Sequence, residues 1–188
     1  FFNTYQCVLL ALCATLAITD ATSTDYCKKQ YCSSNKPHIG CKNNGNFGPE
    51  CPSNAAILQM SKEVKKFVID KHNSVRRGIC EGNYGGLSYA NRMIEVAWDD
   101  ELAQLAEYNV RRCVYSHDSC RNTAVFKNVG QNIAIYTTKS KAQTDIQVIA
   151  GGILDSWLRQ ADNCNMKLIE SYRSNVGSAN ANDFTQMI

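Results

Sequence analysis

Cys113-Val114-Tyr115-Ser116-His117-Asp118-Ser119-Cys120 places a histidine between two cysteines, in a chain of 188 residues with ten cysteines and three histidines. Such a segment is typical either of a zinc site or of a disulfide-bonded loop. Zinc is the weaker interpretation, because no Cys-x-x-Cys pair occurs and the other histidines, His38 and His72, are scattered along the sequence. A chain of this length is expected to form one compact domain.

The N-terminal sequence predicts export. An almost unbroken apolar run extends from Cys7 to Ile18 and is followed by small residues up to Ala21. The run is too short to span a bilayer and fits the apolar region of a secretory signal. A buried helix is the alternative, which the polar residues 22–25 disfavour. Because neither an initiator Met nor a basic flank precedes the run, we expect residues 1–21 to be a signal peptide that lacks its start.

Removal of this signal would leave eight cysteines, an even number that favours disulfides in an exported chain. Spacing alone allows 105 connectivities.

No second apolar run is long enough for a membrane span. The formal net charge is +3, and no Lys/Arg block is dense enough to indicate nucleic-acid binding. Lys62, Lys65, Lys66 and Lys71 are predicted to form the solvated face of a helix, with steering toward anionic cell surfaces as the alternative.

Three amphipathic helices and one strand are predicted. The first helix begins near Ser61 and ends at Gly78, before a surface loop over residues 80–91. Asp99 or Asp100 caps the second helix, and the third begins at about Asp145. A short strand is expected over Ile133–Tyr136. The inner faces are predicted to carry Val64, Phe67, Val68, His72 and Val75 in the first helix, Leu102, Leu105, Ala106, Asn109 and Cys113 in the second, and Ile146, Ile149, Ala150, Ile153, Trp157 and Leu158 in the third.

Residues 25–54 form a stretch of low hydrophobicity that is rich in Cys, Asn, Gly and Pro. Such a segment buries too little apolar surface to fold alone and needs covalent staples. We therefore predict a cysteine-rich N-terminal extension over residues 22–60, wrapped on a main domain over residues 61–188.

Several segments together resemble the CAP superfamily of cysteine-rich secretory proteins, antigen five and pathogenesis-related proteins. They are Lys71-His72-Asn73-Ser74-Val75-Arg76, Ala97-Trp98-Asp99-Asp100-Glu101-Leu102-Ala103, the opening segment Cys113–Cys120, Asn128-Val129-Gly130-Gln131-Asn132-Ile133-Ala134 and Phe184-Thr185-Gln186-Met187-Ile188. The pattern of Asp25-Tyr26-Cys27, Cys32, His38, Cys41 and Cys51 resembles the insect antigen-five branch of venoms and saliva.

The resemblance implies an α+β fold of the CAP type, an α-β-α sandwich with a disulfide-stapled extension. It also implies the disulfides Cys27–Cys41, Cys32–Cys120 and Cys51–Cys113. The family domain normally continues past the Phe-Thr-Gln-Met motif, so we expect the domain over 61–188 to be incomplete at its C-terminus.

Cys80 and Cys164 are extra to that family pattern. The first lies just beyond the first predicted helix and the second beyond the third, and these helices are neighbours in the CAP fold. We therefore predict a fourth bridge, Cys80–Cys164. Pairing with a cysteine beyond the given sequence, or free thiols, are the alternatives.

Many family members carry two His and two Glu in one cleft, which can hold a divalent metal. The matching positions here are His117, Gln131, Gln160 and Asp183, so three of the four depart from that set. Gln is a weak zinc ligand and cannot act as a general base. We expect no metal, no cofactor and no catalytic residues, and interpret His117 as a structural residue.

Two candidate binding surfaces remain. Some salivary antigen-five proteins of blood-feeding flies resemble this chain and present Arg-Gly-Asp to platelet integrins; here Arg76 precedes Arg77-Gly78-Ile79, without the Asp. A plain helix end with a Gly cap is the alternative interpretation. The second candidate is a lipid or sterol groove between the first and third helices, lined by Phe67, Val68, Val75, Ile149 and Ile153.

These observations predict a secreted, monomeric, non-enzymatic salivary or venom effector. Its partner would be a host cell-surface receptor, with a platelet integrin as one candidate, and its effect would fall on haemostasis. A carrier that sequesters small lipids is the first alternative, and a divalent-metal-dependent hydrolase is the second.

Overall fold

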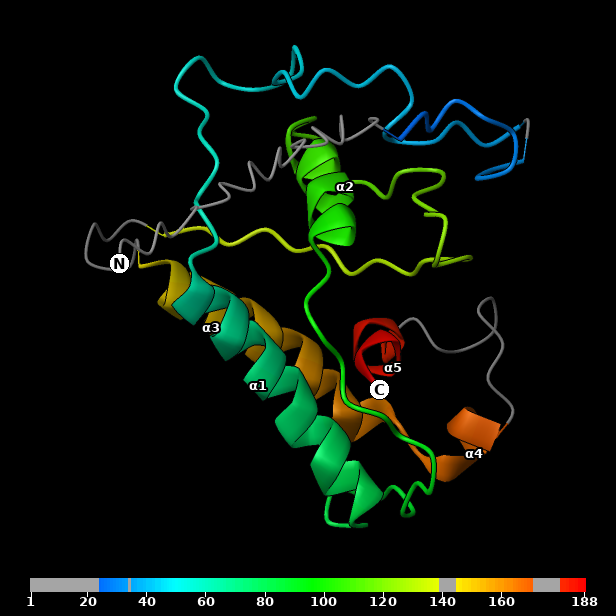
Figure 1. Ribbon diagram of the computed structural model, residues 1–188. Coiled ribbons are helices and arrows are strands. Elements are labelled where there is room, and N and C mark those ends of the chain that lie inside the picture. Colours follow the sequence, from blue (N-terminus) through cyan, green and yellow to red (C-terminus); the bar gives the residue numbers. More distant parts are fainter. Residues whose placement is uncertain (1–23, 34, 139–144, 171–179) are drawn as a thin grey trace, which may run out of the picture.

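The computed structural model describes residues 24–33, 35–138, 145–170 and 180–188 (Figure 1). The predicted signal run, Cys7 to Ile18, lies outside these residues. None of the described helices is both long and apolar enough to cross a membrane.

Helix α1, Lys62–Cys80, begins where the sequence predicts. The Ser61 hydroxyl caps it by accepting a hydrogen bond from the Val64 backbone N–H at 3.3 Å. The predicted end at Gly78 is wrong, because the Glu81 N–H still donates to the Arg77 carbonyl at 3.0 Å. The chain leaves the helix at Gly82, whose φ of +70° is the left-handed conformation that glycine adopts readily.

Helices α2, Asp100–Val110, and α3, Ile146–Leu158, also begin at predicted caps. The Asp99 and Asp145 carboxylates accept backbone N–H groups of the first turns. The assignment of Cys113 to the inner face of the second helix is wrong, because α2 ends at Val110 and Cys113 has a φ of +53°. The short elements η2 (Arg159–Asn163), α4 (Met166–Glu170) and α5 (Asn182–Met187) were not predicted.

Helices α1 and α3 pack side by side (Figure 1). Two consecutive glycines in α3 allow aromatic rings of other segments to approach its backbone closely. A Cβ atom on Gly151 would lie 3.4 Å from the Phe67 ring, and one on Gly152 would lie 3.4 Å from the Tyr136 ring. The helix is therefore held between aromatic side chains of two other segments.

The hydrophobic core lies against the C-terminal half of α1. Phe184 of α5 is completely buried and packs with Val75 and Ile79 of α1. Its ring also stacks on Tyr84 with 5.8 Å between the centroids. Further buried members of this cluster are Leu87, Cys164 and Ala181. The core is thus closed by residues of α1 and α5, which lie more than a hundred positions apart in the sequence.

Two polar side chains of α1 bind the backbone of its neighbours. The buried Asn73 exchanges two hydrogen bonds with Val96, donating to its carbonyl at 3.0 Å and accepting from its N–H at 2.8 Å. The Arg76 guanidinium donates to the carbonyls of Ile94 at 2.8 Å and Met187 at 3.0 Å. Together they fix the segment before α2 and the end of α5 against α1.

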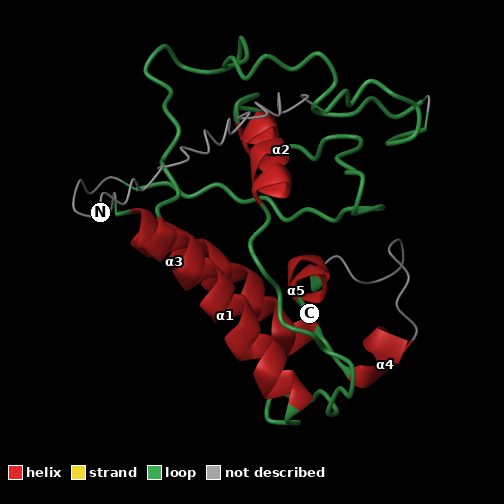
Figure 2. Ribbon diagram, viewed as in Figure 1, coloured by secondary structure: helices red, strands yellow, loops and turns green. Residues whose placement is uncertain are grey.

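The described residues contain helices and loops but no strand (Figure 2). The expected strand Ile133–Tyr136 is therefore not observed, and the α-β-α sandwich is not confirmed. Residues 133–136 lack the regular backbone pairing with a second described segment that defines a strand. One contact of this stretch is a hydrogen bond from the Tyr115 hydroxyl to the Ile133 carbonyl, at 3.4 Å.

The N-terminal extension contains turns but no helix in its described part, and it winds past α2 (Figure 1). Disulfides join Cys27 to Cys41, Cys32 to Cys120 and Cys51 to Cys113, the pairs that the family resemblance implies. The last two pairs tie the extension to the turn that follows α2. Covalent bonds thus replace the apolar core that this segment lacks.

A buried histidine forms the centre of the extension. His38 is only 6% exposed, and its ring stacks on Tyr26 with 4.5 Å between centroids. Nδ1 accepts the Gly40 N–H at 2.9 Å, so the proton is on Nε2, which donates to the Asn122 carbonyl at 2.7 Å. His38 therefore adds a directional, non-covalent link between the extension and the main domain.

The core assignment predicts a large effect of Phe184→Ala. Loss of this completely buried ring should lower the free energy of unfolding by about 3–5 kcal/mol. Ile94→Ala is the control, because its side chain is 80% exposed and the change should stay within about 0.5 kcal/mol. Urea unfolding with the disulfides intact measures both, and equal effects would contradict the placement of the core.

Candidate functional site

The first half of the candidate cleft is a hydrogen-bonded chain of three side chains. His117 and Asp118 follow α2, and Gln131 lies in the extended segment beyond. The Gln131 amide contacts His117 Nδ1 through Oε1 at 2.8 Å and donates from Nε2 to Asp118 at 2.8 Å. Because an ionised Asp118 only accepts, the amide must present its oxygen to His117, whose Nδ1 therefore carries the proton.

Asp118 is the electrostatic centre of this half. Its side chain is 3% exposed, and Arg121 donates to both of its oxygens, at 3.0 and 3.1 Å. Arg121 also donates to the Val129 carbonyl at 2.6 Å. The buried Asp118 carboxylate therefore has both a counter-charge and hydrogen-bond donors, which a buried carboxylate requires. Sequence reasoning overlooked Asp118 and Arg121, although they stand in and beside the opening segment.

The second half joins η2 to α5. Gln160 of η2 donates to the Asp183 carboxylate at 2.8 Å and accepts the Asp183 N–H at 3.0 Å. Asn132, next to Gln131, donates to the Asp183 carbonyl at 2.8 Å. Asp183 is thus bonded to Gln160 and to Asn132, while Gln131 itself bonds His117 and Asp118.

The chemistry of this arrangement differs from that of a metal site. The described residues contain no cluster of three or more His, Cys, Asp or Glu side chains that could hold a metal ion. Both glutamines are used as hydrogen-bonding bridges, and an amide neither ligates zinc strongly nor removes a proton. The donor set therefore does not fit a catalytic divalent metal.

The residues of the predicted Arg-Gly loop lie in a helix and not in a loop. Arg77, Gly78 and Ile79 lie in the last turns of α1, and Ile79 is 3% exposed and belongs to the core. Arg76 is occupied by backbone carbonyls, as described above. Arg77 alone is exposed, at 62% of its side chain, and it pairs with Glu95 at 2.8 Å. The plain helix-end interpretation is the better one.

The predicted bridge Cys80–Cys164 is also wrong, because both thiols are free. The Cys80 sulfur points to the segment after α1, donating to the Ala90 carbonyl at 3.1 Å. Cys164 is buried in the core cluster, and burial raises the pKa of its thiol. The two cysteine side chains thus pack in different surroundings, although α1 and α3, which precede them, are neighbours.

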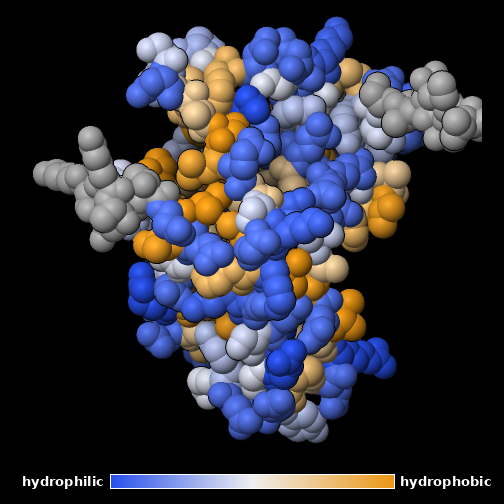
Figure 3. All heavy atoms as spheres, turned by 60° about the vertical axis from the view of Figure 1, so that its left-hand side comes forward, coloured by the Kyte–Doolittle hydropathy of each residue, from blue (hydrophilic) through white to orange (hydrophobic). Residues whose placement is uncertain are grey.

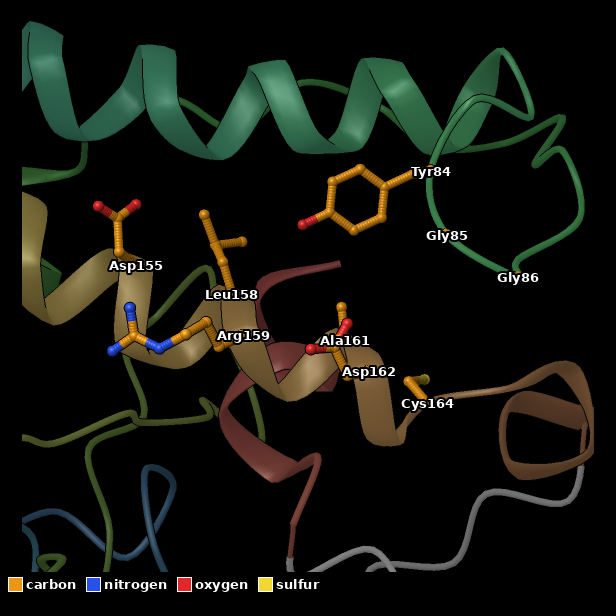
Figure 4. Close-up of a pocket in the computed structure, with 9 residues that line it drawn as sticks. All are labelled: Tyr84, Gly85, Gly86, Asp155, Leu158, Arg159, Ala161, Asp162 and Cys164. Carbon is orange, nitrogen blue, oxygen red and sulfur yellow. The ribbon is translucent and has the colours of Figure 1, made fainter.

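The structure contains a cavity at a different place from the predicted groove. It measures about 740 Å³ and lies between the loop at Tyr84 and the residues of α3 and η2, including Asp155, Leu158, Arg159 and Asp162 (Figure 4). The lining includes none of the five predicted groove residues, and one of them, Val75, belongs to the core. Burial, followed by the nearby Asp162 carboxylate, raises the pKa of the Tyr84 phenol.

Zinc binding distinguishes a hydrogen-bonded cleft from a metal site. The chain should bind no stoichiometric zinc by calorimetry, because two of the four positions hold amides. The variant Gln131→Glu, Gln160→Glu and Asp183→His restores the family's ligand set and should gain a zinc site. A sub-micromolar site in the unmodified chain that is lost on His117→Ala would contradict this assignment.

Comparisons with known proteins show the family of this chain. The model of the cysteine-rich secretory protein (CAP) family matches residues 69–188. The antigen 5 like allergen Cul n 1 of Culicoides nubeculosus is 36% identical, over 91% of this chain and 80% of the relative. Venom allergen-1 of Aedes albopictus is 33% identical, over 96% and 69%. Tabinhibitin 3 of Tabanus yao is 34% identical, over 88% and 63%. The chain belongs to the CAP family, among relatives that include antigen 5-like and venom allergens of insects.

Proposed function

We propose that this chain is a secreted, non-enzymatic effector that modulates host haemostasis by binding a cell-surface receptor. The observation that carries the proposal is that Gln131 and Gln160 stand at two of the four positions and form hydrogen bonds with His117, Asp118 and Asp183. The apolar run from Cys7 to Ile18 and the three disulfides support secretion. The names of the relatives, venom allergens and tabinhibitins, support an effector role.

A platelet integrin is the receptor class that the resemblance suggests. Arg77 is the residue of the predicted loop that remains available for it, because Ile79 is buried and Arg76 is occupied. Glu95 competes for the Arg77 guanidinium, but this ion pair is exposed and therefore weak. A receptor carboxylate can replace Glu95 without unfolding α1.

Arg77→Ala tests this contact in fibrinogen-dependent aggregation of washed platelets. If Arg77 anchors the receptor, the variant should need about tenfold more protein for equal inhibition, the effect of losing one interface anchor. Arg92→Ala, which removes an exposed arginine outside the helix, should inhibit like the unmodified chain. Equal inhibition by all three proteins would show that Arg77 is not the receptor contact. No inhibition by any of them would refute the haemostatic role.

A small-lipid carrier is the second candidate function, and the cavity at Tyr84 favours it. Its volume of about 740 Å³ is within the range of ligand-binding pockets. Leu158 and Ala161 offer apolar surface, while Arg159 and the Tyr84 hydroxyl offer polar contacts for a head group (Figure 4). This cavity would replace the groove predicted from Phe67, Val68, Val75, Ile149 and Ile153.

Filling the cavity tests the carrier function. A tryptophan at Gly86 should displace a lipid, because a side chain there meets no atom within 4 Å and the backbone needs no left-handed φ. Ser88→Trp adds the same ring at an exposed position outside the cavity lining. Solvent extraction and mass spectrometry should find a lipid with the unmodified chain and Ser88→Trp but not with Gly86→Trp. Absence of lipid from all three would refute a carrier.

A further inference from the structure

A small basic pocket in the N-terminal extension has no role in the function proposed above. Its volume is about 220 Å³, and three lysines, Lys28, Lys29 and Lys36, contribute to its lining. The hydroxyl-bearing Ser33 and the buried His38 also line it. We call this site the lysine pocket. Positive groups around one concavity are the chemistry of an anion site.

The lysines of this pocket differ from those of α1 in their partners. On α1, Lys65, Lys66 and Lys71 each form an ion pair with an aspartate. No ion pair with a described carboxylate involves Lys28, Lys29 or Lys36. The positive charge of α1 is therefore largely neutralised within the protein, whereas that of the extension is available to a partner.

The local composition reinforces this difference. Residues 24–60 contain four lysines, against Asp25 and Glu50 as the acidic residues. The Asp25 carboxylate is engaged in its own turn, where it accepts the Cys27 N–H at 3.1 Å. The extension therefore carries an excess of positive charge. One carboxylate from outside it, Glu101, reaches the lining and accepts a hydrogen bond from the Tyr26 hydroxyl at 2.7 Å.

The pocket is built on a rigid frame. The disulfides Cys27–Cys41 and Cys32–Cys120 fix the two turns that carry the lysines. His38, anchored through Asn122, supports the same wall from the interior. The lysine backbones are therefore positioned before any ligand arrives, which lowers the ordering cost of binding.

We propose that the lysine pocket binds a sulfated polysaccharide. Lysine ammonium groups hold sulfate oxygens by charge-assisted hydrogen bonds. A polymer of sulfate groups also releases bound counterions when it binds a cationic site, which gains free energy beyond the direct contacts. This site is independent of the haemostatic receptor and of the cavity at Tyr84.

The lining favours a sulfated glycan over a membrane or a nucleic acid. No Leu, Ile, Phe or Trp lines the pocket, so the lysines have no apolar neighbour there to insert into a lipid layer. The aromatic rings in the lining, Tyr26 and His38, stack on each other at 4.5 Å. Each therefore uses a face that a single-stranded nucleic acid would need for base stacking. Contacts with the lysine ammonium groups are therefore what this lining offers a ligand.

Neutralising the pocket tests the proposal with heparin as the probe. The triple variant Lys28→Gln, Lys29→Gln and Lys36→Gln should bind heparin on the order of a hundredfold more weakly, as expected for three lysines that each face an anionic partner. The salt dependence of its affinity between about 50 and 200 mM should also flatten. The disulfide-bonded chain is used throughout, and the substituted side chains are exposed, so the fold should persist.

Lys62→Gln, Lys65→Gln and Lys66→Gln form the matched control, with the same loss of three charges on α1. This variant should keep its heparin affinity within about threefold, because it leaves the pocket unchanged. Chemically desulfated heparin should not bind. No heparin binding, an equal loss in the control, or equal binding of desulfated heparin would each overturn the proposal. Tighter binding to phosphatidylserine vesicles or to a single-stranded oligonucleotide would overturn it in favour of those partners.

Discussion

The fold depends on covalent closure of the N-terminal extension onto the segment after α2. The Cys32–Cys120 disulfide joins residues 88 positions apart, and Cys51–Cys113 joins residues 62 positions apart. Each such bond removes unfolded-state entropy worth about 2–4 kcal/mol. The extension buries few side chains apart from Tyr31 and His38, so these bonds supply what its packing cannot. They also hold the loop of the opening segment, and with it His117 and Asp118.

The molecule has two centres of different chemistry. Around α1, α5 and η2 the centre is apolar, with Phe184 between Tyr84 and the helix. Around α2 and the extension it consists of disulfides, stacked rings and buried polar groups such as Thr123 and Asp118. The space-filling view likewise shows hydrophobic patches interrupted by hydrophilic side chains rather than one continuous apolar face (Figure 3). The hydrogen-bonded cleft joins the two centres, because Gln131 and Asn132 connect Asp118 to Asp183.

What the sequence predicted well was local. Ser61, Asp99 and Asp145 cap helices through their own side chains, so no distant residue is needed to find them. The free-energy terms that decide these features act within a few residues.

The wrong or missing predictions concern features that depend on contacts between segments distant in the sequence. Gly78 and Gly82 are both plausible helix ends, and Gly82 has the left-handed conformation that ends the helix. A strand over residues 133–136 needs a partner strand, which its own pattern cannot provide. Cys80 and Cys164 follow adjacent helices, but a disulfide depends on where each sulfur points. Asp118 and Arg121 were overlooked because a buried ion pair has no sequence periodicity.

The position of Phe184 in the sequence determines when the hydrophobic core can close during folding. The apolar face of α1 belongs to residues 62–80, yet the ring that covers it arrives more than a hundred residues later, and Arg76 bonds Met187 across 111 positions. Contacts of such separation in sequence close slowly, since the loop between them must first be ordered. A nascent chain therefore leaves Val75 and Ile79 uncovered by this ring until residue 184 has been synthesised. Apolar surface that stays exposed for so long favours aggregation before the core closes.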